Sequence, residues 1–249
     1  VRLEAVRGLA QIQTSAAAES IARALDQPVD RFLDFAIWQS MRDLQPFWYP
    51  AFSRGEPMFN GNTEHIIFAV RAVDSPDAGQ LLVRLIEGGT IEEARQFELM
   101  RIVGDIGTAA NIADLLHLLT QRMSKGDRSE RTVFMTRDLC GSSRARKLIP
   151  PGAAGLLADW RGVDHPVITS TRLRAAGYWD QASFVPELAM IAKAGNSSPQ
   201  LLAAIDGLGF FGSPDSRRVL LELGRRTKDP NVIKGVVESV ARSDLPAAA

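Results

Sequence analysis

The chain has 249 residues, of which 45% are hydrophobic and 23% are charged, and its 29 basic side chains balance its 29 acidic ones. Such a composition is typical of a folded chain, and the lack of a basic excess argues against a general nucleic-acid-binding protein. No apolar run reaches the roughly 20 residues that a membrane-spanning helix needs, and the single cysteine, Cys140, excludes an intrachain disulfide framework and any CxxC site.

The first 25 residues predict two helices joined by a tight turn. Val6, Leu9 and Ile12 recur at intervals of three, which places them on one stripe of a helix. The stripe stops before Thr14, a residue type that caps helices, and apolar Ile21 follows seven residues later.

The same spacing returns along the chain, so the sequence contains an internal repeat. We place its turns at Thr14, Pro46, Ser75, Thr108, Gly141, Gln181 and Ser213, which are 29 to 40 residues apart. Around the five clearest turns, apolar residues stand eight, five and two positions before and seven positions after: Val6, Leu9, Ile12 and Ile21; Ile67, Val70, Val73 and Leu82; Met100, Val103, Ile106 and Leu115; Leu173, Ala176, Trp179 and Leu188; Ile205, Leu208, Phe211 and Leu220. The turns at Pro46 and Gly141 fit less well, and Thr136 interrupts the stripe before Gly141. Because one helix pair cannot bury its apolar face alone, stacked neighbours are expected to form the core.

Two segments carry a family resemblance. The stretches VRLEAVRGLAQIQTSAAAESIARAL and LLAAIDGLGFFGSPDSRRVLLEL resemble the short-unit type of HEAT-like helical repeat. The resemblance implies an all-α fold, a right-handed alpha-alpha superhelix of about seven helix pairs that forms one armadillo-like domain over residues 1–249. We expect a weaker repeat at 122–165. The leading function hypothesis is a noncatalytic protein-interaction or scaffolding module.

Residues 46–65, PFWYPAFSRGEPMFNGNTEH, depart from the repeat with three prolines, two glycines and five aromatic residues. We expect an irregular insertion there. Because Trp, Tyr and Arg are enriched at interaction hot spots, this region together with Trp38, about two helical turns upstream, is the candidate interaction surface, made of Trp38, Phe47, Trp48, Tyr49, Phe52, Arg54 and Phe59. The alternative is that the insertion folds back and buries these rings against the repeats.

A basic segment follows between residues 122 and 147. It contains Arg122, Lys125, Arg128, Arg131, Arg137, Arg144, Arg146 and Lys147, opposed only by Asp127, Glu130 and Asp138. One interpretation is an anion patch that binds a polyanion; the other is a solvated loop and helix face, since no aromatic residues are interleaved for base stacking. Cys140 lies among these cations, which would make it reactive, unless it is simply a small buried side chain.

No catalytic motif accompanies the repeats. GxSxG, Walker A and HExxH sequences are absent, and His65, His117 and His165 are too far apart for a local metal motif. A HEAT-like enzyme would need His and Glu clustered at repeated positions, so we expect structural histidines, no cofactor and no metal.

A narrower resemblance covers about residues 1–75. VRLEAVRGLA, ALDQPVDRFLDFAIWQSMRDLQPFWYPAF and FNGNTEHIIFAVRAV resemble the helical-repeat region of large planctomycete-type proteins that also contain a β-propeller and a c-type haem domain. This implies a periplasmic or exported dehydrogenase or electron-transfer protein whose catalytic and haem residues lie outside this chain. The partners would then be neighbouring domains. Because the sequence begins inside a repeat helix, we expect a fragment of a longer protein.

Overall fold

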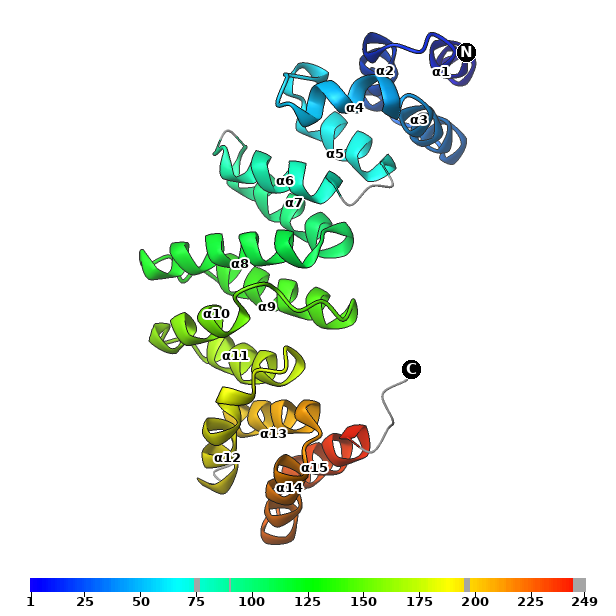
Figure 1. Ribbon diagram of the computed structural model, residues 1–249. Helices are drawn as coiled ribbons and strands as arrows, with labels where there is room; N and C mark the ends of the chain where they lie inside the picture. The colour runs from blue at the N-terminus through cyan, green and yellow to red at the C-terminus, as the bar shows by residue number, and fades with distance from the viewer. Residues whose placement is uncertain (74–76, 90, 195–197, 244–249) are drawn as a thin grey trace. The chain divides into compact units, whose positions relative to one another are not determined.

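The computed structural model describes residues 1–73, 77–89, 91–194 and 198–243. Every regular element within these ranges is a helix, which confirms the all-α prediction (Figure 1). The chain forms two compact units, Val1–Gly107 and Thr108–Ala249. In chain order, the described helices α1 to α14 alternate as first and second helices of seven pairs, and α15 follows them. The arrangement is that of a HEAT-like repeat.

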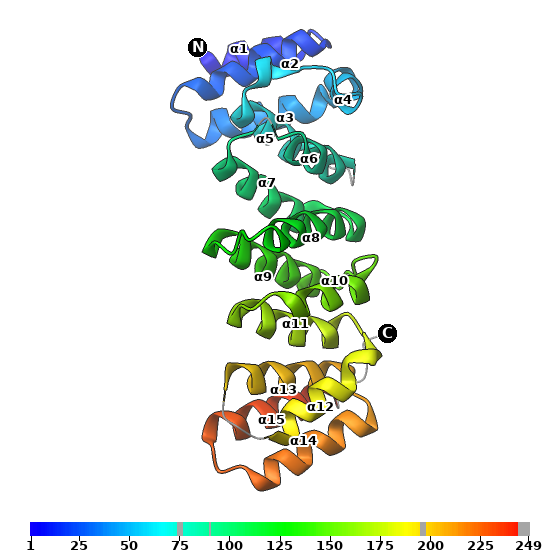
Figure 2. The same ribbon diagram turned by 90° about the vertical axis from the view of Figure 1, so that its left-hand side faces the viewer.

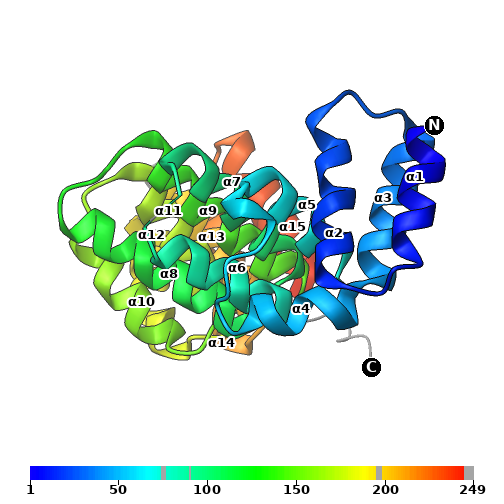
Figure 3. The same cartoon turned by 90° about the horizontal axis from the view of Figure 1, so that it is seen from above.

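Unit 1 contains the first three pairs and the first helix of the fourth. In chain order its elements are α1 (Arg2–Ala10), α2 (Ser15–Ala22), the 3₁₀ turn η1 (Arg23–Asp26), α3 (Arg31–Asp43), α4 (Gln45–Ser53), the 3₁₀ turn η2 (Phe59–Gly61), α5 (Thr63–Ala72), α6 (Asp77–Glu87) and α7 (Glu93–Ile106). α1 packs against α2 and α3, and α3 packs in turn against α5 (Figure 3).

Unit 2 contains the remaining helices. They are α8 (Ala109–Ser124), α9 (Glu130–Ala145), α10 (Ala153–Asp159), the 3₁₀ turn η3 (Trp160–Gly162), α11 (Pro166–Tyr178), the 3₁₀ turn η4 (Ala182–Phe184), α12 (Val185–Ala194), α13 (Pro199–Phe211), α14 (Pro214–Arg226) and α15 (Pro230–Ser243). The first helices α9, α11 and α13 pack successively on one another, as Figure 2 shows, and the last helix α15 packs on α13 in the same way.

Three of the predicted turns, at Thr14, Thr108 and Ser213, coincide with caps of second helices. At each of them the side-chain oxygen accepts a hydrogen bond from the main-chain N–H three residues later: Thr14 from Ala17 (3.2 Å), Thr108 from Asn111 (3.3 Å) and Ser213 from Ser216 (3.1 Å). Each bond satisfies one of the N–H groups that a helix start leaves without an intrahelical acceptor. Gln181 precedes η4, and Pro46 stands in the first turn of α4. Ser75 lies outside the described residues.

The turn predicted at Gly141 is wrong. Gly141 lies inside α9, which continues to residue 145, and the chain turns over residues 146–152. Two residues of that turn have a left-handed φ, Lys147 (55°) and Gly152 (72°), and Gly152 directly precedes α10. Glycine at that position avoids the strain that a side chain would impose.

Buried hydroxyl groups explain why the sequence pattern does not predict where α9 ends. Thr136 donates a hydrogen bond to the Thr132 carbonyl (2.9 Å), and Ser143 donates one to the Leu148 carbonyl (2.8 Å). Both side chains are fully buried. Because the main chain satisfies their hydroxyls, polar residues occupy core positions where the sequence pattern expects apolar ones.

The apolar columns of the repeat form the core. The positions eight before and seven after the five clearest turns are all buried: Val6, Ile67, Met100, Leu173 and Ile205, and Ile21, Leu82, Leu115, Leu188 and Leu220. The position two before the turn is less consistent, since Trp179 is buried whereas Ile12 is 55% exposed. That position falls at the helix end, where the neighbouring helices cover less of the chain.

Two glycines let the first helices of unit 2 approach backbone to backbone. A Cβ atom on Gly177 of α11 would collide with the main chain of Gly207 on α13. A Cβ atom on Gly207 would in turn collide with the Leu173 carbonyl and press on the Leu188 methyl groups (3.2 and 3.3 Å). Glycine is required at both positions because the spacing leaves no room for a methyl group.

An ion pair crosses from α11 to α12. The Arg172 side chain is buried, and its guanidinium donates two hydrogen bonds to the Glu187 carboxylate (2.5 and 3.0 Å), which also accepts one from Arg161 (2.8 Å). These bonds, with Arg172 making the larger contribution, lower the pKa of Glu187.

Candidate functional site

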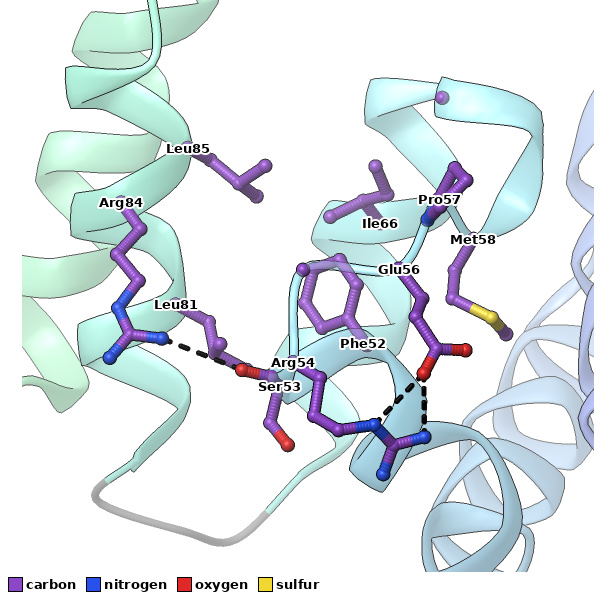
Figure 4. Close-up of a pocket in the computed structure, with 12 residues that line it drawn as sticks. Phe52, Ser53, Arg54, Glu56, Pro57, Met58, Ile66, Leu81, Arg84 and Leu85 are labelled. Carbon is purple, nitrogen blue, oxygen red and sulfur yellow. Dashed lines mark hydrogen bonds and ion pairs between the residues drawn. The ribbon is translucent and has the colours of Figure 1, made fainter.

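A half-open pocket in unit 1 is the candidate functional site. It has a volume of about 450 Å³ and lies between the end of α4, residues 54–62 and the facing sides of α5 and α6 (Figure 4). Its lining is Phe52, Ser53, Arg54, Gly55, Glu56, Pro57, Met58, Gly61, Ile66, Leu81, Arg84 and Leu85.

The pocket exists because the second repeat departs from the regular pattern. The predicted irregular segment 46–65 is irregular only in part, since α4 covers residues 45–53 and α5 begins at residue 63. Between them, Gly55, Phe59, Asn60 and Gly61 all have positive φ values, so residues 54–62 form a tightly folded loop. This loop forms a wall of the pocket that a short turn between helices would not supply.

Buried contacts fix the loop in place. Met58 and Phe59 are 7% and 2% exposed, and the Phe59 N–H donates a hydrogen bond to the Glu19 carboxylate on α2 (2.9 Å). At the start of α5, Asn62 caps the helix and the His65 ring hydrogen bonds the Asp26 carboxylate (2.8 Å). The pocket wall is therefore held by the core of unit 1.

The floor of the pocket is apolar and its rim is charged. Figure 4 shows Phe52, Ile66 and Leu81 gathered on the inside, with Leu85 above them on α6. Most of the lining surface is contributed by such apolar side chains. An apolar group of a ligand would therefore gain free energy by leaving water and entering the pocket.

Two guanidinium groups stand at the rim. Arg54 donates two hydrogen bonds to Glu56 (2.9 and 2.7 Å), but both side chains are more than half exposed, so the pair contributes little stability and can exchange partners. Arg84 reaches the Ser53 carbonyl at 3.4 Å, and within the described ranges it forms no ion pair. The rim thus carries two cations and one anion.

The structure corrects the predicted aromatic surface. Trp48 is fully buried, donates its indole N–H to the Met41 carbonyl (3.0 Å) and packs edge-on against Phe59 (5.5 Å between centroids). Phe52 is only 6% exposed, although one side of it reaches the pocket. Trp48 and Phe59 therefore belong to the core, where large apolar rings gain most from burial, and cannot act as an exposed contact.

The other members of the predicted aromatic surface remain at least partly accessible. Phe47 is 40% exposed and Tyr49 is half-buried. Trp38 is half-buried on α3, where it stacks on exposed Phe35 (6.0 Å between centroids) and lies under Arg42. Of the predicted set, only Phe52 and Arg54 line the pocket.

Most of the pocket could not be found from the sequence. Ile66, Leu81 and Leu85 lie on regular repeat helices next to columns of core residues, and nothing in the sequence distinguishes them from the core. The departure of residues 46–65 from the repeat was the one signal that indicated this region.

The structure also corrects the predicted anion patch, because it separates the basic residues. Arg122, Arg128 and Arg131 lie around the start of α9, whereas Arg144, Arg146 and Lys147 lie at its end, with Arg137 between them. From Arg131 to Arg144 the helix rises about 20 Å, so these cations do not form one site. Local contacts also occupy some of them: Arg137 pairs with Asp138 (2.8 Å) and Arg128 reaches the Asp164 carbonyl (3.5 Å).

Cys140 and the histidines offer no reactive arrangement. Cys140 is fully buried, and burial raises the pKa of its thiol well above the usual range, so the reactive interpretation is wrong. His165 caps α11 by accepting from the Val167 N–H (3.2 Å), and His117 is exposed on α8. Within the described ranges, no three or more His, Cys, Asp or Glu side chains gather in a way that would hold a metal ion.

Comparison with known proteins identifies one repeat. Residues 1–27, which cover α1, α2 and η1, match the family described as PBS lyase HEAT-like repeat. No curated protein and no solved structure matches the chain. The comparisons therefore support the HEAT-like resemblance. They give no support to the planctomycete-type multidomain resemblance. None of the described helices is long and apolar enough to cross a membrane.

Proposed function

We propose that the chain is a noncatalytic protein-interaction module, and that the pocket in unit 1 receives an apolar side chain of a partner polypeptide. The observation that carries the proposal is the pocket itself, a half-open and largely apolar cavity of about 450 Å³ with a charged rim. HEAT-like repeats commonly bind proteins, and the match over residues 1–27 supports a role of that kind.

The lining favours binding over chemistry. Its polar side chains are Ser53, Arg54, Glu56 and Arg84, and none is paired with a histidine or a second carboxylate that would activate it. A nucleophilic hydroxyl such as that of Ser53 is usually activated by such a neighbour within hydrogen-bond reach. An apolar cavity with a few polar groups at its edge is instead the arrangement in which an anchoring side chain is buried.

The rim predicts the chemistry of the partner. Arg54 and Arg84 outnumber Glu56, so an acidic residue next to the apolar anchor would find a guanidinium at the mouth of the pocket. Carboxylates bind guanidinium groups through short, charge-assisted hydrogen bonds. We therefore expect a segment in which a leucine, methionine or phenylalanine is flanked by Asp or Glu. The segment would belong to a separate protein or to a neighbouring domain of a longer chain.

Selection from a displayed random-peptide library tests this proposal. Peptides would be enriched on the wild-type chain and then assayed against two variants, Leu85→Glu and Leu221→Glu. Leu85 lines the pocket on α6, whereas Leu221 is a 41% exposed leucine on α14 that undergoes the same chemical change. Leu85→Glu should weaken binding about tenfold or more, which corresponds to about 1.4 kcal/mol, and Leu221→Glu should not.

The composition of the enriched peptides is a second readout. An apolar residue beside an acidic one should recur among them, and binding should survive in the Leu221→Glu control. Enriched peptides that bind Leu85→Glu as tightly as wild type, or that are basic, would count against the proposed role of the pocket. Circular dichroism would confirm that each variant is folded. If Leu85→Glu is not folded, Leu85→Ala would replace it as the test variant.

A further inference from the structure

The ends of α9, α11, α13 and α15 in unit 2 bring together charged and aromatic residues that lie far apart in the sequence. Arg144 is in the last turn of α9, Arg174 is on α11, Phe210 is near the end of α13 and Arg242 is in the last turn of α15. These helices are successive neighbours (Figure 2). We call Arg144, Arg174, Arg242 and Phe210 the guanidinium cluster.

Phe210 is the centre of the cluster. The guanidinium carbon of Arg144 lies 4.6 Å from the ring centroid, and that of Arg242 lies 4.3 Å from it. Tyr178 meets the same ring edge-on, with centroids 5.6 Å apart and an angle of 88°. Cation–π contacts of this kind fix the guanidinium planes and leave their N–H edges free to bind an acceptor.

The charges within the cluster are not balanced. Among the described residues, Asp206 is the one carboxylate that pairs with these arginines; it accepts from Arg174 Nε at 2.9 Å, whereas its nearest contact to Arg242 is 3.8 Å, beyond a hydrogen bond. Arg144 forms no ion pair with any described residue, and it contacts Phe210 instead. Arg174 and Arg242 therefore share one carboxylate, and Arg144 adds a third cation without a paired anion in the part of the chain that the structure describes.

One N–H group in the cluster also lacks an acceptor. Arg242 Nη1 is buried and has no hydrogen-bond partner among the described residues. A buried donor without an acceptor is costly, and such groups are rare in folded proteins. An acceptor oxygen that entered beside Phe210 would satisfy it and would also neutralise the surplus charge.

We propose that the guanidinium cluster binds carboxylate side chains of an acidic polypeptide segment. Arginine matches a carboxylate with two parallel hydrogen bonds, and partial burial strengthens that attraction relative to bulk water. The cluster is compact and contains three cations, whereas nucleic acid would need a track of contacts along a phosphate backbone. The site rests on residues of unit 2 alone and does not depend on the pocket of unit 1.

A fluorescein-labelled oligoglutamate peptide is a direct probe. Its binding to the full chain would be followed by fluorescence anisotropy at low ionic strength, with an oligoglutamine peptide as the uncharged comparison. The test variant is the double substitution Arg144→Gln and Arg242→Gln. The matched control is Lys125→Gln with Arg131→Gln, which removes two exposed cations near the other end of α9.

The expected result is a loss of about tenfold or more in oligoglutamate affinity for the test variant and less than about twofold for the control. Equal losses in both variants, or none in the test variant, would overturn the proposal. Oligothymidylate that binds as tightly as oligoglutamate would show a general polyanion surface instead. If the test variant is poorly folded by circular dichroism, Arg144→Lys with Arg242→Lys retains the charge, and a loss of affinity there would still implicate the planar guanidinium groups.

Discussion

Replacing Gly207 with alanine tests the close backbone approach of α11 and α13. Gly207 lies inside α13, and the added methyl group would meet the Leu173 carbonyl of α11 and the methyl groups of Leu188. Leu188 can shift by a few tenths of an ångström, but the carbonyl belongs to a helix backbone and cannot move without moving α11. We therefore expect the substitution to separate two packed helices.

Two effects of opposite sign determine how Gly207→Ala changes the free energy of unfolding. Alanine favours an α-helix over glycine by about 1 kcal/mol. Overpacking a core by one or more methyl groups costs about 1–3 kcal/mol, and an obstacle made of backbone points to the upper end. The net loss should be about 2 kcal/mol, which for a chain of this size lowers the Tm by about 4–8 °C.

Gly141→Ala is the matched control with the opposite expected sign. Gly141 also lies inside a helix, α9, but nothing stands within 4 Å of the position that its Cβ would occupy. Only the propensity gain of about 1 kcal/mol remains, so the Tm should rise by about 2–4 °C.

Thermal unfolding followed by circular dichroism would measure both variants. A Gly207→Ala protein at least as stable as wild type would show that α11 and α13 are not in backbone contact. A Gly141→Ala protein that is destabilised would place Gly141 in a turn, as the sequence pattern alone suggested, and would refute the observed extent of α9.

Two further predictions concern the core. Glu187→Gln leaves buried Arg172 without its charged partner and should cost about 3 kcal/mol near neutral pH. Because the pKa of Glu187 is lowered in the folded state, its stabilisation is complete above the usual glutamate value of 4.5 and is lost as the pH falls below it. The Tm difference between wild type and this variant should therefore shrink in acid, and a difference independent of pH would contradict the ion pair. Val103→Asp places a carboxylate at a fully buried position and should cost at least about 3 kcal/mol in urea unfolding; wild-type-like unfolding would show that the repeat register is wrong.

The repeat could be predicted because helix pairs impose a simple period on the sequence. Val6 and Ile21 illustrate the reason: each lies on the buried stripe of its helix, and Thr14 between them caps the second helix. The same reasoning failed at Gly141, since buried Thr136 and Ser143 satisfy their hydroxyls within the fold and look like surface residues in the sequence.

The sites were harder to predict because they depend on contacts between repeats. Trp48 looks like a binding residue by type, but the loop that follows α4 brings Phe59 against it and completes its burial. Arg144 looked like one member of a basic segment, yet it contacts Phe210 of α13, and the same ring also contacts Arg242 of α15. Spacing along the chain does not report which helix ends meet.

Affinity capture from an extract of the source organism tests the central claim most directly. Immobilised wild-type chain would be compared with Leu85→Glu and with the Leu221→Glu control, and bound proteins would be identified by mass spectrometry. Each protein so identified would then be purified and its Kd measured by calorimetry against all three chains. The account predicts a partner that binds wild type and Leu221→Glu alike and binds Leu85→Glu at least about tenfold more weakly. A partner that binds all three folded chains equally would contradict the assignment of the pocket as the interaction site.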